Sequence, residues 1–175
     1  MALRPDLAWQ ASLFDTGEID YDPAFTGARR RELTEGAWVE HVPAWLSGAD
    51  ELFSRLLDAT PWGQHDRWMY ERKVTEPRLT HRWSLEADTE QGRPPAVLQD
   101  VAATLSARYD VEFRQVGVNL YRDGSDSVAW HGDRIAREIP EATVALVSLG
   151  APRPFKLRPK GGGTSITYLP GPGDL

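Results

Sequence analysis

Two stretches of the sequence place apolar residues at helical spacing. The first begins near Ser47, a suitable N-cap, and ends before Pro61. Its apolar positions are Leu52, Phe53, Leu56 and Leu57. The second begins at Pro94-Pro95, because proline suits the first turn of a helix. Its apolar positions are Val97, Leu98, Val101 and Leu105. The sequence therefore predicts two scaffold helices whose apolar faces are buried.

From Val111 onward the pattern changes to short segments in which apolar and polar residues alternate. We expect strands at 113–121, 127–133, 142–149, 153–158 and 164–169. Turn signals separate them at Asp123-Gly124, at 161–163 and at 170–173. Helices followed by closely spaced strands favour an α+β fold, and a jelly roll fits the spacing.

Composition narrows the chemistry. The chain has 175 residues and 41% hydrophobic residues, which suffices for one buried core. It has no cysteine, so disulfides, thiolate metal sites and cysteine nucleophiles are excluded, and a metal needs nitrogen and oxygen ligands. The N-terminus carries no apolar signal segment, and residues 142–151 are too short to span a bilayer. We expect a soluble, cytoplasmic protein with no membrane partner.

The charge distribution is uneven. A net charge of −6 argues against a general nucleic-acid coat protein. However, residues 151–163 carry four basic side chains and no acid, and residues 67–82 are also locally basic. A single exposed arginine is ordinary protein surface, so only this clustering indicates an anionic partner.

Candidate chemistry centres on His131 and Asp133. Two residues apart in an expected strand, their side chains leave the same face and can reach one cation together. An imidazole and a carboxylate are two of the three ligands of the facial triad that binds non-heme Fe(II). Alone, such a pair is a weak signal.

The strand expected before His131 and Asp133 strengthens the case for a metal site. Gln115, Gly117, Asn119 and Tyr121 share one face, whereas Val116, Val118 and Leu120 share the other. Asn119 and Tyr121 can donate an amide and a phenol to a carboxylate ligand. The alternative, an ordinary hydrogen-bonded pair at a sheet surface, stays open.

Four motifs, in this order and spacing, resemble the AlkB family of Fe(II)/2-oxoglutarate dioxygenases. They are 119–124 (NLYRDG), 130–133 (WHGD), 148–150 (SLG) and 153–158 (RPFKLR). Upstream, Pro77-Arg78 resembles the segment before that family's nucleotide-recognition lid. The resemblance runs from about Trp38 to the last residue. It implies a double-stranded β-helix (jelly roll) with N-terminal helices packed on it, divided into an arm of residues 1–35 and a dioxygenase domain of residues 36–175.

The resemblance also assigns residues. It makes His131 and Asp133 the iron ligands, and makes Asn119 and Tyr121 contacts to the carboxylates of 2-oxoglutarate. The implied substrate-binding residues are Arg78, Trp68, Tyr70, Trp83, Arg153 and Arg158, with the last two facing a phosphate backbone. An aromatic residue of the lid segment can stack on a flipped base. Core packing is the alternative for each of these aromatics.

The implied function is Fe(II)- and 2-oxoglutarate-dependent oxidative demethylation of 1-methyladenine and 3-methylcytosine in DNA. The reaction uses O₂ and releases formaldehyde, and we expect a monomer. Two alternatives stay open: an AlkB-like oxygenase that acts on RNA, protein or a small molecule, and a non-catalytic nucleic-acid-binding relative.

The sequence departs from the family pattern at two places. The family's second iron-binding histidine and two later arginines have no counterpart after Asp133, because His41, His65 and His81 all precede it. We therefore expect a jelly roll that is incomplete at its C-terminus, a fragment of a longer enzyme with little activity alone. Ile135 stands where many DNA-repairing members have an acidic residue, which leaves the preferred base open.

Overall fold

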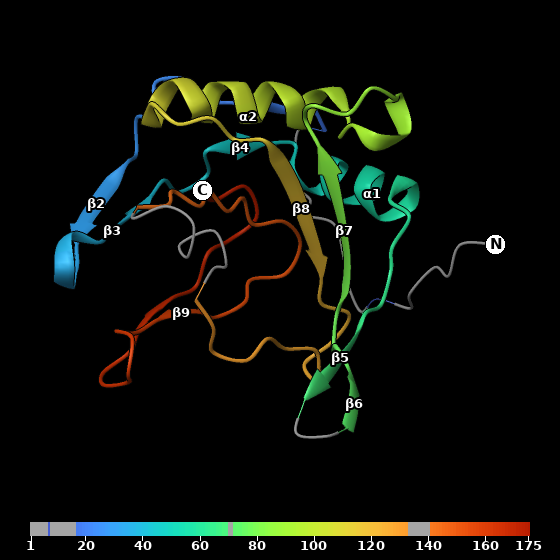
Figure 1. Ribbon diagram of the computed structural model, residues 1–175. Helices are drawn as coiled ribbons and strands as arrows, with labels where there is room; N and C mark the ends of the chain where they lie inside the picture. The colour runs from blue at the N-terminus through green and yellow to red at the C-terminus, as the bar shows by residue number, and fades with distance from the viewer. Residues whose placement is uncertain (1–6, 8–16, 70–71, 133–140) are drawn as a thin grey trace. The chain divides into compact units, whose positions relative to one another are not determined.

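The computed structural model describes Leu7 and residues 17–69, 72–132 and 141–175 (Figure 1). The chain divides into two compact units. The first unit contains Leu7 and the described residues within 57–132, and the second contains 17–56 and 141–175. No described helix is long and apolar enough to cross a membrane.

The described part of the first unit contains one complete α-helix, the short 3-10 helix η2 (Glu90–Gly92) and two antiparallel strand pairs. Its elements are β5 (Asp66–Met69), β6 (Arg72–Thr75), β7 (Leu79–Ser84), α2 (Ala96–Tyr109) and β8 (Gln115–Leu120). β5 pairs with β6, and β7 pairs with β8 over six residues each. Figure 1 shows α2 across one end of the β7–β8 ribbon.

The start and end of α2 follow from its sequence. The helix begins directly after Pro95, whose carbonyl accepts a hydrogen bond from the Leu98 amide. It ends where Asp110 takes a left-handed conformation with φ of 53°. Val101 and Leu105 are buried, so the predicted second helix and the centre of its apolar stripe are confirmed.

The β7–β8 ribbon has one apolar and one polar face. Burial alternates along β8, with Val116, Val118 and Leu120 less exposed than their neighbours, as period-two side-chain geometry requires. The cross-strand register extends this division to β7. The polar face consists of Thr80, Arg82, Ser84, Gln115, Gly117 and Asn119. The predicted strand and its division into two faces are confirmed.

The second unit contains three further antiparallel pairs. Its elements are β1 (Asp20–Tyr21), β2 (Arg29–Glu32), the 3-10 helix η1 (Thr34–Gly36), β3 (Trp38–His41), β4 (Leu46–Ser47), residues 49–56 of α1 (Ala49–Ala59), β9 (Phe155–Leu157) and β10 (Ile166–Tyr168). β1 pairs with β4, β2 with β3, and β9 with β10. Trp45 is 1% exposed and stacks between Tyr21 and Phe25, while its indole N–H donates to the Asp22 carbonyl. This aromatic cluster is the centre of the unit's core.

α1 begins differently from the prediction. Ser47 lies in β4 and is not the N-cap, because its hydroxyl donates to the carbonyls of Glu18 and Asp20. The Gly48 carbonyl accepts the first helical bond from Leu52. Gly48 has φ of +64°, and a Cβ there would collide with the Glu18 carbonyl. The helix ends at Ala59, before Pro61, as predicted.

Residues 171–175 are hydrogen-bonded to β3, β4 and the segment that joins them. Val42 and Leu175 exchange two backbone hydrogen bonds of 2.9 and 3.1 Å. The Leu46 amide donates to the Gly173 carbonyl, and Ser148 bonds the same segment from its other side. Residues far apart in the sequence therefore form one backbone network.

The Asp174 carboxylate is the polar centre of that network. It accepts hydrogen bonds from the amides of Ala44 (2.8 Å) and Gly171 (2.9 Å) and lies 2.9 Å from His41 Nε2. Burial raises the pKa of Asp174, but the hydrogen bonds outweigh it and hold the pKa below its usual value. The carboxylate therefore joins three segments in its charged form.

Two expected strands are absent from the described residues. Strands β8, β9 and β10 lie within three of the predicted ranges, but residues 127–132 and 142–149 contain no strand. Alternation shows which side chains share a face but does not supply a hydrogen-bonded partner. Val144 and Leu146 are 61% and 46% exposed, and Ser148 alone makes ladder-like bonds, to residues 173 and 174. The seven strands β1–β7, which precede α2, were not predicted from the sequence. The domain boundary at residue 35 stays a prediction.

Candidate functional site

His131 has one ring nitrogen fixed and the other presented outward. The side chain is exposed, and its Nδ1 lies 2.8 Å from the Ala129 carbonyl oxygen. Because a carbonyl oxygen only accepts, Nδ1 donates this hydrogen bond, and Nε2 is the ring nitrogen that remains for a metal. This is the usual arrangement of a metal-binding imidazole, whose other nitrogen is held by a backbone oxygen. Asp133 and Ile135 lie outside the described residues.

A rigid turn leads from β8 toward His131. Asp126 is 3% exposed and accepts hydrogen bonds from the Arg122 amide (2.8 Å), Nε (2.8 Å) and Nη2 (2.9 Å). The hydrogen bond with Asp126 raises the pKa of Arg122. The Ser127 amide then donates to the Pro77 carbonyl at 2.9 Å. The sequence predicted the turn at Asp123-Gly124 but missed Asp126, although an acid four residues after an arginine was a readable signal.

Asn119 lies on the polar face of β8, and Tyr121 comes directly after the end of this strand. Asn119 is exposed and lies opposite Thr80 of β7. Tyr121 directly follows the strand, is half-buried, and its hydroxyl accepts a hydrogen bond of 3.3 Å from Arg78 Nη1. The structure thus brings Tyr121 and Arg78 together, and Asn119 lies two residues before Tyr121, within β8.

Arg78 is held in place on two sides. Its side chain is 15% exposed, and Nε lies 3.7 Å from a carboxylate oxygen of Glu76, which is 13% exposed. The Arg78 amide also donates to the Glu76 carbonyl at 2.9 Å. Arg78 therefore lies beside Tyr121 at the start of β7, and its predicted contact with substrate stays a prediction.

The predicted aromatic residues of the lid segment differ in position. Trp83 is 6% exposed and packs on the apolar face of the ribbon, with its ring edge-on to His81 at 4.6 Å. This position favours the core-packing alternative for Trp83. Trp68 lies in β5 opposite Lys73, and nothing further is described of its side chain. Tyr70 lies outside the described residues.

The predicted phosphate contacts belong to the second unit. Arg153 is half-buried and precedes β9, and Arg158 is exposed and directly follows it. The exposed Lys156 and Lys160 lie in the same segment. Contact of these side chains with a phosphate backbone stays a prediction.

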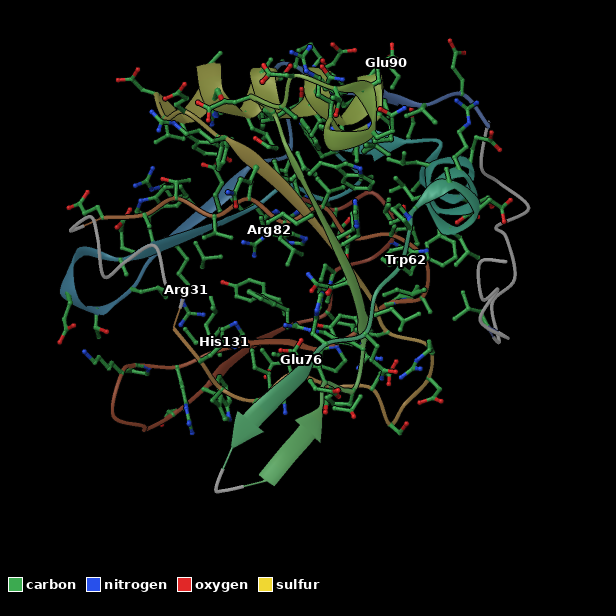
Figure 2. The ribbon with its side chains drawn as sticks, turned by 45° about the vertical axis from the view of Figure 1, so that its right-hand side comes forward. Arg31, Trp62, Glu76, Arg82, Glu90 and His131 are labelled. Atoms are coloured by element: carbon green, nitrogen blue, oxygen red, sulfur yellow. The ribbon has the colours of Figure 1, made fainter. Side chains whose placement is uncertain are left out.

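The donor chemistry at His131 fits Fe(II). No three His, Asp or Glu side chains cluster within the described ranges. An imidazole with a fixed Nδ1–H and an exposed Nε2 is a suitable ferrous ligand, and Asp133 is a carboxylate two residues away. In Figure 2, His131 lies in the lower half of the view, well away from α2 at the top.

Residues 39–170 match the profile of the 2OG-Fe(II) oxygenase superfamily. The chain belongs to this family, whose members use Fe(II) and 2-oxoglutarate. The expected class of enzyme, a 2-oxoglutarate-dependent dioxygenase, and the expected cofactors are therefore confirmed at the level of the family.

The similar proteins confirm an AlkB-like member. The chain is 32% identical over 123 residues to the rat alpha-ketoglutarate-dependent dioxygenase alkB homolog 3, covering 66% of this chain and 41% of that protein. The mouse homolog is 31% identical over 123 residues, covering 66% and 43%. The human homolog is 31% identical over 120 residues, covering 64% and 42%. The chain spans about two fifths of the length of these relatives.

Proposed function

We propose that this chain serves an Fe(II)- and 2-oxoglutarate-dependent enzyme that demethylates alkylated bases in DNA. The proposed substrates are 1-methyladenine and 3-methylcytosine, and the products are the repaired base and formaldehyde. This proposal rests on His131, whose Nδ1 is held by the Ala129 carbonyl so that Nε2 can bind a metal, in a chain similar to alkB homolog 3. We further propose a double-stranded β-helix as the fold and a cytoplasmic monomer as the working form.

The residues of the first unit have distinct roles in this mechanism. His131 Nε2 and the Asp133 carboxylate would hold Fe(II), while the Asn119 amide and the Tyr121 hydroxyl would donate to the carboxylates of 2-oxoglutarate. When bound, iron and 2-oxoglutarate supply oxidation of the methyl carbon by O₂, with release of succinate and CO₂. The Ala129 carbonyl fixes the His131 ring, and the bonds between Arg122 and Asp126 fix the turn before it.

A nucleic-acid substrate is supported by charge and by aromatic residues. Arg158, Lys156 and Lys160 form an exposed basic segment around β9, and guanidinium groups suit phosphate oxygens. In this proposal Arg153 and Arg158 contact the phosphate backbone of the nucleic acid. Arg78 is a further substrate-binding residue. Trp68 or Tyr70 stacks on the extruded base.

The test is a demethylation assay with Fe(II), 2-oxoglutarate and O₂. Methylated single-stranded DNA, duplex DNA and RNA are compared, and formaldehyde and succinate are both measured. We expect formaldehyde from methylated DNA, and loss of turnover in His131→Ala but not in His65→Ala, whose imidazole is also exposed. Equal turnover in His131→Ala would contradict the assigned metal site.

Two alternatives have specific support. The net charge of −6 and Ile135 favour an AlkB-like oxygenase acting on RNA, protein or a small molecule. A non-catalytic nucleic-acid-binding relative is the second alternative, and the exposed basic segment around β9 supports it. Turnover confined to RNA supports the first alternative. DNA affinity that His131→Ala leaves unchanged, without turnover in either protein, supports the second.

A further inference from the structure

Arg82 is an arginine without an acidic partner on an otherwise uncharged polar face. It is exposed, and no described acidic side chain forms an ion pair with it. Its neighbours on the polar face of β7–β8 are Thr80, Ser84, Gln115, Gly117 and Asn119, none of them charged. Two other arginines adjoining the ribbon are neutralised, Arg78 by Glu76 and Arg114 by Glu112. The net positive charge on this face is therefore that of Arg82.

Open space lies opposite Arg82. Its cross-strand partner is Gly117, and a Cβ added to Gly117 would meet no atom within 4 Å. Gly117 is not among the residues with positive φ, so its backbone does not require glycine. The missing side chain thus leaves room for a small ligand beside the guanidinium group.

Arg82 reaches diagonally across the ribbon. Its Nη1 donates to Gln115 Oε1 at 3.3 Å, and Gln115 is one of its two diagonal neighbours on β8. The other diagonal neighbour is Asn119, and such pairs are about 7–8 Å apart at their Cα atoms. A ligand over Gly117 would therefore lie between the Arg82 guanidinium group and the Asn119 amide. Figure 2 shows Arg82 along this ribbon, between Glu90 and Glu76.

We propose that Arg82 binds a carboxylate of 2-oxoglutarate in the space over Gly117, beside Asn119. The inference rests on the proposed function, in which Asn119 already contacts this dicarboxylate. A guanidinium group pairs with a carboxylate through two parallel hydrogen bonds, and an anion of two negative charges needs such a cation. The other residues of this face are uncharged, so no acid on it repels the carboxylate.

The experiment measures 2-oxoglutarate binding by calorimetry on the full chain, with Mn(II) in place of Fe(II) so that no turnover occurs. Arg82→Gln should weaken 2-oxoglutarate binding roughly 10- to 100-fold, the loss expected for hydrogen bonds to a charged group. Arg82→Lys should recover part of this loss, because it keeps the charge but not the planar fork. Arg114→Gln, which removes an exposed arginine already paired with Glu112, should bind as the unaltered protein does.

Gly117→Val provides a second, independent variant. Valine suits a strand and has open space here, so the fold should persist, as circular dichroism can verify. The valine side chain would nevertheless occupy the space assigned to the carboxylate. We expect 2-oxoglutarate binding at least 10-fold weaker, with unchanged affinity for an unmethylated oligonucleotide.

The outcomes separate this inference from the proposed function. Unchanged 2-oxoglutarate affinity in both Arg82→Gln and Gly117→Val overturns the inference, while methyl-dependent succinate release by the same proteins leaves the proposed function intact. Loss of oligonucleotide affinity with unchanged 2-oxoglutarate affinity also overturns it, because the anion would then be a phosphate. Absence of 2-oxoglutarate binding by the unaltered protein overturns the proposed function itself.

Discussion

Arg122 and Asp126 are joined by three hydrogen bonds, one from the backbone amide and two from the guanidinium group of Arg122. The carboxylate is 3% exposed, whereas the arginine side chain is 32% exposed. The pair closes the turn between β8 and the segment that carries His131. The Arg122–Asp126 pair therefore affects function by positioning the segment that carries His131. Its contribution to stability can be measured directly.

Asp126→Ala should destabilise the first unit by about 1–3 kcal/mol, because it removes three hydrogen bonds and leaves the partly buried Arg122 without its carboxylate. Urea unfolding followed by tryptophan fluorescence measures the change. Glu51→Gln is the matched control, since Glu51 bonds Arg55 on an exposed helix face and should change stability by less than about 0.5 kcal/mol. Equal effects of the two substitutions would contradict the special role of Asp126.

Tyr121→Phe should raise the KM for 2-oxoglutarate by roughly 10-fold, the loss of one hydrogen bond to a charged group. The ring remains, so the half-buried packing of Tyr121 should persist. Steady-state kinetics with 2-oxoglutarate as the varied substrate measures this change. Tyr168→Phe is the control, because Tyr168 lies in β10 against His41 and not beside Arg78. An unchanged KM in Tyr121→Phe would remove this hydroxyl from the proposed site.

His81 should make stability depend on pH near neutrality. Burial lowers the pKa of His81 below 6.5, so the folded protein holds this ring neutral where the unfolded chain protonates it. The contribution of the neutral His81 ring to the free energy of unfolding is complete above pH 6.5. It is lost as the pH falls from 6.5 toward the pKa of His81 in the folded protein. Thermal unfolding at pH 7.5 and 5.5 should show less loss in His81→Phe than in the unaltered protein. His65→Phe, at an exposed site, should retain the loss.

Asp174 should make the stability of the fold depend on pH in a second, more acidic range. Its folded pKa is lowered below 3.8, so its contribution is present above that value and is lost as the pH falls through the folded pKa. Asp174→Asn should cost about 1–3 kcal/mol at neutral pH, because an amide cannot accept from Ala44, Gly171 and His41 together. Chemical denaturation measures this, and Asp20→Asn, at an exposed position, is the control. Equal losses would contradict the central role of Asp174.

The sequence predicted the elements whose pattern is local. The stripe of α2 and the alternation of β8 depend only on spacing, and both were confirmed. It misplaced the cap of α1, because Ser47 is held by the carbonyls of Glu18 and Asp20 and the Glu18 carbonyl leaves no room for a Cβ at position 48, and both contacts come from far away in the sequence. The strand expected at 142–149 failed for a related reason, since its partner cannot be deduced from alternation.

The candidate site divides in the same way. Asn119 could be placed on a polar face from alternation alone, whereas the bond between Arg78 and Tyr121 joins residues 43 positions apart. Arg82 was read only as part of a basic segment. Its place opposite Gly117 follows from the register of β7 on β8, which no local pattern contains.

Gly48 carries a consequence for tolerance to sequence variation. Gly36, with φ of +76°, and Gly48, with φ of +64°, are both left-handed, but a Cβ at Gly36 would meet no atom within 4 Å, whereas a Cβ at Gly48 would meet the Glu18 backbone. A saturation library scored for cellular abundance should therefore accept asparagine at codon 36 and reject every replacement at codon 48. At position 48 the fold therefore requires the absence of a side chain, because the Glu18 backbone occupies the place of the Cβ.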